Sequence, residues 1–254
     1  MKPINIPLFS YHGNKDNEMD IIKENLPDMT NIDTIIEPYG GSFALIRYLL
    51  TIYPNKEYIC VDNDKLLIET YQTLQDDTLC NELLEFYKSL KINNKTDYDA
   101  FKKTNSVKSY LYTHVIYSLV SGLFNKNKHC FNERDFNRLI HFNKTYKNIK
   151  FLCSDASEII DEYKNNSRCF IFLDPPFLLT SSFYSCTKSN NLDIFFKLLM
   201  DINKLDSKLL CVCGDNFLLI PFYEKYNIKI KFLSTLFYRG NKTKEHKNYY
   251  VSNY

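Results

Sequence analysis

The sequence predicts an α/β fold in which a mostly parallel sheet is wrapped by helices and carries an antiparallel edge. Three observations predict this fold. Short apolar runs alternate with helix-like segments along most of the chain, two strand-like runs follow each other directly near the end, and one connection is far longer than a crossover helix requires. With 254 residues the chain can form one large domain, or a domain with an inserted lobe, and can bury a substantial core.

The apolar runs are rich in β-branched and aromatic side chains. They predict five parallel strands, at residues 34–36, 58–61, 149–153, 170–173 and 209–213. The segments between them predict helices at residues 42–53, 65–90, 157–163 and 192–205. The last two runs, at residues 228–237 and 249–253, are expected to pair as the antiparallel edge that mixed sheets commonly have.

The long connection at residues 76–148 predicts an inserted helical lobe, with residues 1–75 and 149–254 forming the main domain. Within the lobe, apolar residues recur at helical spacing at Leu111, Val115, Leu119 and Leu123. A polar, basic segment follows at residues 125–129. It is typical either of a solvated loop or of a loop whose amides and lysines contact base edges and phosphates, and the sequence leaves both interpretations open.

Composition excludes several classes of protein. The eight cysteines lie mostly in apolar runs without paired-ligand spacing, which predicts neither a disulfide scaffold nor a metal site. No run approaches the roughly 18 apolar residues that span a bilayer, so we expect a soluble, cytoplasmic protein without membrane contact. The net charge of +2 is too small to indicate nucleic-acid binding, which would require a local basic face.

Ligands of open α/β sheets bind outside the carboxyl ends of the strands. The first predicted strand runs into the glycine-containing turn Glu37-Pro38-Tyr39-Gly40-Gly41-Ser42-Phe43, and the next three end near Asp62, Asp155 and Asp174. A single acidic residue there is usually a helix cap, but acidic residues after all four strands indicate a binding site. Because the rim is anionic and the P-loop pattern is absent, it suits a positively charged cofactor.

The segment Asp174-Pro175-Pro176-Phe177 follows the fourth strand. Two prolines stiffen the turn, so the Asp174 carboxylate and the Pro175 carbonyl can both face one exocyclic amino group. Phe177 offers a face on which a planar base can stack, an interaction worth about 1–3 kcal/mol. The alternative interpretation is a strand-terminating turn with a phenylalanine in the core.

These motifs, in this order, resemble the Dam-type adenine-N6 DNA methyltransferases, the alpha group of S-adenosylmethionine-dependent amino-methyltransferases. The similarity spans nearly the whole chain and lies at residues 11–15, 37–43, 61–64, 122–132, 174–177 and 248–254. The resemblance implies a Rossmann-like methyltransferase sheet, S-adenosylmethionine as cofactor, and double-stranded DNA as partner. It also implies a DNA target-recognition role for the lobe, no metal, and a monomer or weak homodimer.

The resemblance also implies residue roles. The cofactor would be bound by Tyr11, Lys15, Glu37, Tyr39, Gly40, Gly41, Asp62, Asp155 and Asp174. Lys15 would pair with its carboxylate, Asp62 with its ribose hydroxyls and Asp155 with its adenine. The target base would be held by Asp174, Pro175, Pro176 and Phe177. DNA contacts are expected from Lys126, Lys128, Asn132, Arg134, Arg138 and Arg239.

Two positions depart from the family pattern. Phe43 stands where many relatives carry glycine, and Phe177 replaces a tyrosine but keeps the stacking face. The expected function is site-specific methylation of a flipped-out adenine in DNA, of the restriction-modification type. The alternatives are an RNA or cytosine-N4 methyltransferase, or an inactive nucleic-acid-binding subunit of the same fold.

Overall fold

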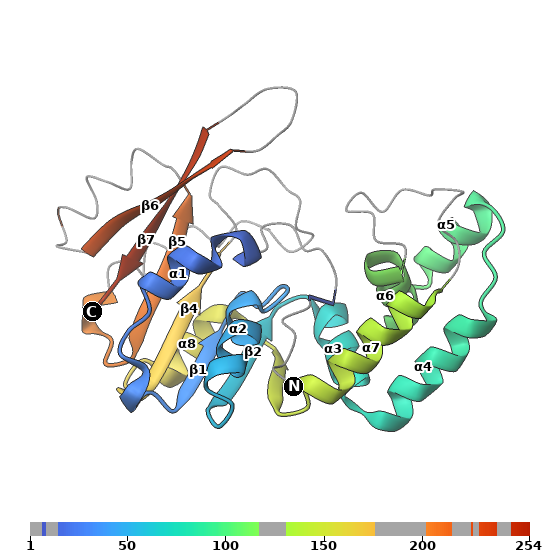
Figure 1. The fold of residues 1–254 in the computed structure, drawn as a ribbon, viewed down its shortest axis with the longest axis horizontal. Helices are drawn as coiled ribbons and strands as arrows, with labels where there is room; N and C mark the ends of the chain where they lie inside the picture. The colour runs from blue at the N-terminus through green and yellow to red at the C-terminus, as the bar shows by residue number, and fades with distance from the viewer. Residues whose placement is uncertain are drawn as a thin grey trace.

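The computed structural model describes residues 7–8, 15–116, 131–175, 202–214, 225, 229–237 and 245–254. These residues build a seven-stranded sheet with the order β3-β2-β1-β4-β5-β7-β6 (Figure 1). The strands are β1 (Thr34–Glu37), β2 (Glu57–Asp62), β3 (Ile149–Cys153), β4 (Cys169–Leu173), β5 (Lys208–Gly214), β6 (Lys229–Phe237) and β7 (Glu245–Ser252).

The first five strands are parallel, and β7 runs antiparallel between β5 and β6. The predicted parallel strands and the antiparallel edge are therefore confirmed, although β7 begins four residues before the predicted start. From β1 the chain moves outward through β2 and β3 and then returns to the other side of β1 as β4. The reversal lies between β1 and β4, where doubly wound sheets bind their ligands.

Both faces of the central strands are covered. Every residue of β1 and β4 is buried, as expected for parallel strands with helices on either side. Side chains alternate between two cores. Ile35 packs with α2 (Ala44–Ile52) on one face, and Ile36 packs with α8 (Ala156–Tyr163) on the other. The helix α1 (Met19–Glu24) adds Met19 and Ile22 to the first core. Two short 3₁₀ helices, η1 (Lys15–Glu18) and η2 (Met29–Asn31), flank α1.

The single helix predicted at residues 65–90 is wrong, because the structure divides it into α3 (Lys65–Gln75) and α4 (Asp77–Ser89). Asp76 adopts an extended conformation between them, and its side chain accepts a hydrogen bond from the backbone N–H of Leu79 at 2.9 Å. The aspartate therefore ends one helix and caps the next. Of the helix predicted at residues 192–205, the structure describes residues 202–205, and the first three of these form the short 3₁₀ helix η4 (Ile202–Lys204).

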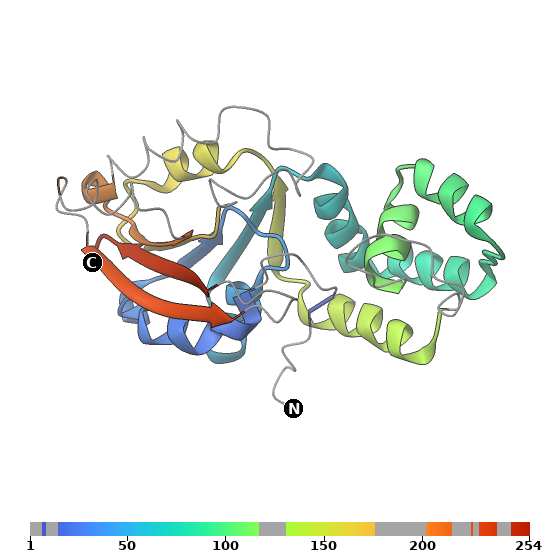
Figure 2. The ribbon, with the colours of Figure 1, turned by 90° about the horizontal axis from the view of Figure 1, so that it is seen from above.

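The described residues from 76 to 148 form helices and no strand. They are α4, α5 (Lys95–Lys103), α6 (Val107–Leu111), the π-helical segment η3 (Tyr112–Ile116) and α7 (Glu133–Thr145). These elements lie together beside the sheet, and α3 packs against α6 and α7 (Figures 1 and 2). Leu111 and Val115 are buried as their spacing predicts, whereas Leu119 and Leu123 lie outside the described residues. The domain boundaries at residues 76 and 148 stay a prediction.

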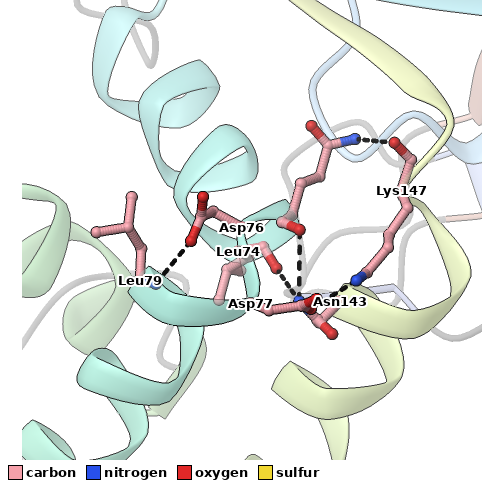
Figure 3. Close-up of polar contacts among 7 residues, drawn as sticks. Leu74, Asp76, Asp77, Leu79, Asn143 and Lys147 are labelled. Carbon is pink, nitrogen blue, oxygen red and sulfur yellow. Dashed lines mark hydrogen bonds and ion pairs between the residues drawn. The ribbon is translucent and has the colours of Figure 1, made fainter.

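Polar contacts join the segment that leads from α3 into α4, near Asp77, to the segment that leads from α7 back to β3, after Asn143 (Figure 3). The Asn143 amide donates to Asp77 at 3.1 Å and to the last but one carbonyl of α3 at 3.0 Å. Asp77 also forms an ion pair with Lys147 at 2.5 Å. The Gln75 amide donates to the carbonyl of Ile149, the first residue of β3, at 2.8 Å. The helices are thus fixed to the edge of the sheet.

Among the described helices, none has the length and apolarity needed to cross a membrane.

Candidate active site

The turn after β1 lies closely against β2. The Gly40 N–H donates to the carbonyl of Val61 at 2.7 Å, and a Cβ added at Gly40 would lie 2.3 Å from the Cys60 sulfur. Gly41 has a φ of 47°, in the left-handed region that favours glycine. Steric constraints therefore favour glycine at both positions, and the two residues together bring the backbone of the turn to the carboxyl end of β2.

Phe43 has the backbone conformation of a glycine, with φ 42° and ψ 49°, although it is an aromatic residue. The left-handed conformation costs roughly 1–2 kcal/mol for a residue with a side chain. The buried ring packs edge-on against Tyr71, Tyr146 and Phe151, with ring centroids 5.1 to 5.3 Å away. Aromatic pairs of this kind contribute about 0.5–1.5 kcal/mol each, which offsets the strain. The departure at Phe43 is therefore explained by core packing, and the turn keeps a glycine-like backbone.

The N-cap residue of α2, Phe43, makes no side-chain capping bond. Glu37 caps the helix instead. The Glu37 carboxylate, 3% exposed, accepts a hydrogen bond from the Ile46 N–H at 3.1 Å. Burial raises the pKa of Glu37 to about 8, and the nearby Asp174 charge adds to this shift, while Arg47 and the helix N–H groups oppose it. Glu37 is thus a largely protonated group at neutral pH beside Asp174.

Asp62 is held at the end of β2 by two backbone groups. One oxygen accepts from the Gly41 N–H at 3.0 Å and the other from the Asp64 N–H at 2.9 Å. Burial raises the pKa of Asp62, and these two hydrogen bonds oppose the rise. Asp64 itself caps α3 and accepts a hydrogen bond from the Tyr110 hydroxyl at 3.1 Å. Tyr110 lies on α6, so the helices beside the sheet contact this end of β2, a link that no sequence motif predicts.

Asp155 takes the helix-cap role that sequence reasoning offered as its alternative. Its carboxylate accepts from the backbone N–H of Ser157 at 2.8 Å and from the Ser157 hydroxyl at 2.6 Å, at the start of α8. Tyr39 is half-buried, and burial raises the pKa of its hydroxyl, with Cys211 and Asp155 adding to the shift. The cofactor contacts expected of Tyr39 and Asp155 stay predictions.

Asp174 follows β4, the strand beside the reversal in strand order, and is paired with Lys15. The Lys15 ammonium lies 2.9 Å from the Asp174 carboxylate, and the two side chains are 4% and 19% exposed. Burial raises the pKa of Asp174, Lys15 opposes this shift, and the charge of Glu18 adds to it. The structure therefore joins the amino-terminal segment to the Asp-Pro-Pro-Phe segment, two motifs that are distant in sequence.

Glu18 and Tyr250 also belong to this group of side chains, and sequence reasoning assigned them no role. Both are buried, and the Tyr250 hydroxyl donates to Glu18 at 2.9 Å. Glu18 lies 3.7 Å from the Lys15 ammonium. The only sequence signal for Glu18 is its place one helical turn after Lys15.

Of the three described residues that are predicted to contact DNA, two make hydrogen bonds within the chain, and their DNA contacts stay predictions. Asn132 caps α7 by accepting from the Asp135 N–H at 3.1 Å. Arg134 is exposed, whereas the half-buried Arg138 donates to the carbonyl of Pro7 at 3.1 Å. The other predicted site residues lie outside the described residues: Tyr11, Pro176, Phe177, Lys126, Lys128 and Arg239.

The charges at this edge of the sheet fit a cofactor with a positive charge. Two acidic side chains, Glu18 and Asp174, share one ammonium, that of Lys15. Buried acidic groups in excess over basic ones favour binding of a cation. In the part of the chain that the structure describes, no cluster of three or more His, Cys, Asp or Glu side chains could hold a metal ion.

Comparisons with known proteins agree with the sequence motifs. Residues 11–204 match the family model of the D12 class N6 adenine-specific DNA methyltransferases. A type II methyltransferase of Methanocaldococcus jannaschii, M.MjaIII, is 31% identical over 263 residues, which covers 88% of this chain and 89% of the relative.

Two solved structures are also similar over 92% of this chain. One is a precorrin-6y C5,15-methyltransferase from Geobacter metallireducens, with a TM-score of 0.37, 9% identity and 84% of its chain covered. The other is the N-terminal domain of human METTL16 in complex with SAH, with a TM-score of 0.38, 12% identity and 66% of its chain covered.

Proposed function

Because the chain belongs to the D12 class N6 adenine-specific DNA methyltransferase family, we propose that Asp174 and Pro175 hold the amino group of the target adenine. The protein is a DNA adenine-N6 methyltransferase that uses S-adenosylmethionine. Membership in this family favours adenine in DNA over the alternatives, an RNA or cytosine-N4 methyltransferase and an inactive subunit. The observation that carries the proposal is the half-buried Asp174 carboxylate beside the reversal in strand order, held by Lys15.

The residues that would bind the cofactor lie at the same carboxyl ends of the parallel strands. S-adenosylmethionine supplies an electrophilic methyl group on a positively charged sulfur. Asp62 is oriented by two backbone N–H groups and would accept hydrogen bonds from the ribose hydroxyls. Gly40 lets the turn backbone lie directly against β2, because a side chain there would collide with Cys60, and this places the turn beside Asp62. Lys15 would pair with the carboxylate of the methionine end, and Tyr11, Glu37, Tyr39, Gly41 and Asp155 would complete the pocket.

The target base would be rotated out of the DNA duplex, because its amino nitrogen is otherwise inaccessible. Extrusion costs a few kcal/mol, which stacking on Phe177 and hydrogen bonds to the base edge offset. The Asp174 carboxylate and the Pro175 carbonyl would accept hydrogen bonds from the amino group and draw its lone pair out of conjugation with the ring. Catalysis then depends on positioning and electrostatics, and the proton leaves the nitrogen after transfer.

We further assign the chain to the Dam-type alpha group and, by its relative, to the type II methyltransferases of restriction-modification systems. The assignment to the alpha group is supported by the ordered motifs from Tyr11 to the closing Asn253-Tyr254. The helices of residues 76–148 would contact double-stranded DNA, with Arg134 exposed for a phosphate contact. We expect a soluble, cytoplasmic protein that acts as a monomer or weak homodimer.

The test is the variant Asp174→Asn, which removes the charge and keeps the shape. Methyl transfer to duplex DNA should fall by about 10²–10³-fold, the range for removal of one preorganised electrostatic group. Cofactor affinity, measured by calorimetry, should change little. The matched control is Asp161→Asn, which removes a carboxylate from the surface of α8, where it pairs with Lys164. Full activity of Asp174→Asn would overturn the proposal.

A further inference from the structure

The carboxyl-terminal strand reaches the active site through one hydrogen bond. Tyr250 of β7 donates its hydroxyl to Glu18 of η1 at 2.9 Å, and both side chains are buried. A buried carboxylate needs hydrogen-bond donors or a positive partner, since it has lost its contact with water. The Tyr250 hydroxyl satisfies one of the two Glu18 oxygens, and the other faces the Lys15 ammonium at 3.7 Å.

The contacts continue from Glu18 to the catalytic motif. The Lys15 ammonium lies between two carboxylates, 3.7 Å from Glu18 and 2.9 Å from Asp174. The order of contacts is therefore Tyr250, Glu18, Lys15, Asp174, from β7 through η1 to the end of β4. In a network of this kind the removal of one member changes the positions of the others, because Tyr250, Glu18 and Lys15 are buried away from water.

We propose that Glu18 and Tyr250 are positioning residues, which hold the Lys15 ammonium against Asp174 and thereby fix the carboxylate that receives the target amino group. The inference rests on the proposed role of Asp174. Without the Tyr250 hydroxyl, the Glu18 carboxylate has lost a donor and competes with Asp174 for the ammonium. Lys15 then moves toward Glu18, and Asp174 loses part of its orientation.

The pH dependence of catalysis gives a signature for this arrangement. Among the described residues, the charged and titratable groups that face Asp174 are Lys15 and Glu18 of η1, Glu37 at the end of β1, and Tyr250 of β7. Burial has the largest effect on the pKa of Asp174 and raises it, Lys15 lowers it, and the charge of Glu18 raises it further. Weaker contact with Lys15 therefore raises this pKa, and removal of the Glu18 charge lowers it. Glu37 does not compete for Lys15 in this way, because its carboxylate accepts from the Ile46 N–H.

The first experiment compares Tyr250→Phe with Tyr254→Phe. Tyr254 is a matched control, since its hydroxyl also joins the carboxyl-terminal segment to the amino-terminal helices, by donating to the Asn25 carbonyl at 2.6 Å. We expect kcat of Tyr250→Phe to fall about tenfold, the change for one hydrogen bond to a charged group. KM for DNA should stay close to the parent value, and the acid limb of the pH–rate profile should move to higher pH. Tyr254→Phe should keep the parent kcat and profile.

A second variant, Glu18→Gln, keeps the inference falsifiable if Tyr250→Phe does not fold, which thermal unfolding will show. Its amide oxygen can still accept from Tyr250, but the charge is gone. The acid limb should therefore move to lower pH, opposite to the shift for Tyr250→Phe. The inference would be overturned if the acid limb of the pH–rate profile stayed at the parent pH in both folded variants. It would also be overturned if Tyr250→Phe had the same kcat as Tyr254→Phe. The same assay of Asp174→Asn separates the two hypotheses. If Asp174→Asn is inactive, a failure of the positioning inference leaves the proposed function standing. Full activity of Asp174→Asn rejects the proposed function itself.

Discussion

The backbone N–H of Gly41 donates to the carboxylate of Asp62 at 3.0 Å, which fastens the turn after β1 to the end of β2. The other oxygen of Asp62 is engaged by the Asp64 N–H. A carboxylate offers about four acceptor positions, so these two bonds fix its direction and leave capacity for two hydroxyl donors. The geometry suits a vicinal diol such as that of a ribose.

Asp62→Ala should lower cofactor affinity by about tenfold or more, because the carboxylate both meets the ribose and holds the glycine turn. Calorimetric titration with S-adenosylmethionine measures this, and kcat at saturating cofactor should fall much less than the affinity. Asp28→Ala is the control, since Asp28 also accepts from a backbone N–H, that of Thr30, but on an exposed 3₁₀ helix. An unchanged affinity in Asp62→Ala would remove the ribose role.

Glu37 predicts a dependence of stability on pH. In the folded protein its pKa is about 8, well above the value of about 4.3 expected in the unfolded chain. Between these two values the folded state binds more protons than the unfolded state, so the stabilising contribution is complete below the lower value and is lost as the pH rises through about 8. Within this window the folding equilibrium changes by up to about tenfold per pH unit.

Glu37→Gln should therefore become more stable relative to the parent as the pH rises from about 5 to about 8, since glutamine keeps an acceptor for Ile46 and does not ionise. Urea unfolding of the protein without cofactor at both pH values gives the difference. The exposed Glu82, on α4, supplies the control Glu82→Gln, whose stability should follow that of the parent. If the free energies of unfolding of Glu37→Gln and of the parent changed equally between the two pH values, Glu37 would have an ordinary pKa in the folded protein.

The hydrogen bonds of Asn143 are predicted to stabilise the attachment of the helices of residues 76–148 to the sheet. Its buried amide donates to the Leu74 carbonyl and to Asp77 (Figure 3). Asn143→Leu should destabilise the protein by about 1–3 kcal/mol, because the buried carbonyl of Leu74 loses this side-chain donor. If the helices position DNA, KM for DNA should also rise. Lys147→Ala removes only an exposed contact to Asp77 and should leave the unfolding midpoint nearly unchanged, whereas equal effects of both variants would contradict the role of burial.

The sequence predicts the parallel strands well because each is a short, mostly apolar run bounded by polar residues, as at residues 170–173. The break at Asp76 was missed, since apolar spacing continues across it and only the paired aspartates indicate a cap. The site was partly predictable. Asp62 and Asp174 stand at strand ends, where topology places ligands. The contact between Glu18 and Tyr250 joins residues 232 positions apart, so no local pattern indicates it.

Phe177 is predicted to act through its ring. Phe177→Tyr should keep substantial methylation activity, because either ring offers a stacking face, and Phe177→Ala should lose most of it, since stacking is worth about 1–3 kcal/mol. Single-turnover methyl transfer to a short DNA duplex measures both variants, with cofactor affinity as the check that the pocket is intact. Equal losses in the two variants would indicate that side-chain size, and not stacking, matters at this position.

Lys126 and Lys128 are predicted to contact DNA phosphates, on the basis of the amide- and lysine-rich segment in which they stand. Each phosphate contact releases condensed counterions, so log K falls with log salt by a slope of about 0.9 per contact. Replacing both lysines by alanine should weaken binding to all sequences alike and reduce this slope by up to about 2, while cofactor affinity stays constant.

The matched control removes two positive charges elsewhere. Lys164 and Arg168 lie before the amino end of β4, where they pair with Asp161 and Asp33. Binding titrations at several salt concentrations should show that Lys164→Ala with Arg168→Ala keeps the parent slope, because these charges lie away from the carboxyl ends of the strands. If the lysine variant also keeps the parent slope, the lysines face solvent, and the phosphate contacts must come from the basic residues between Arg239 and Lys247.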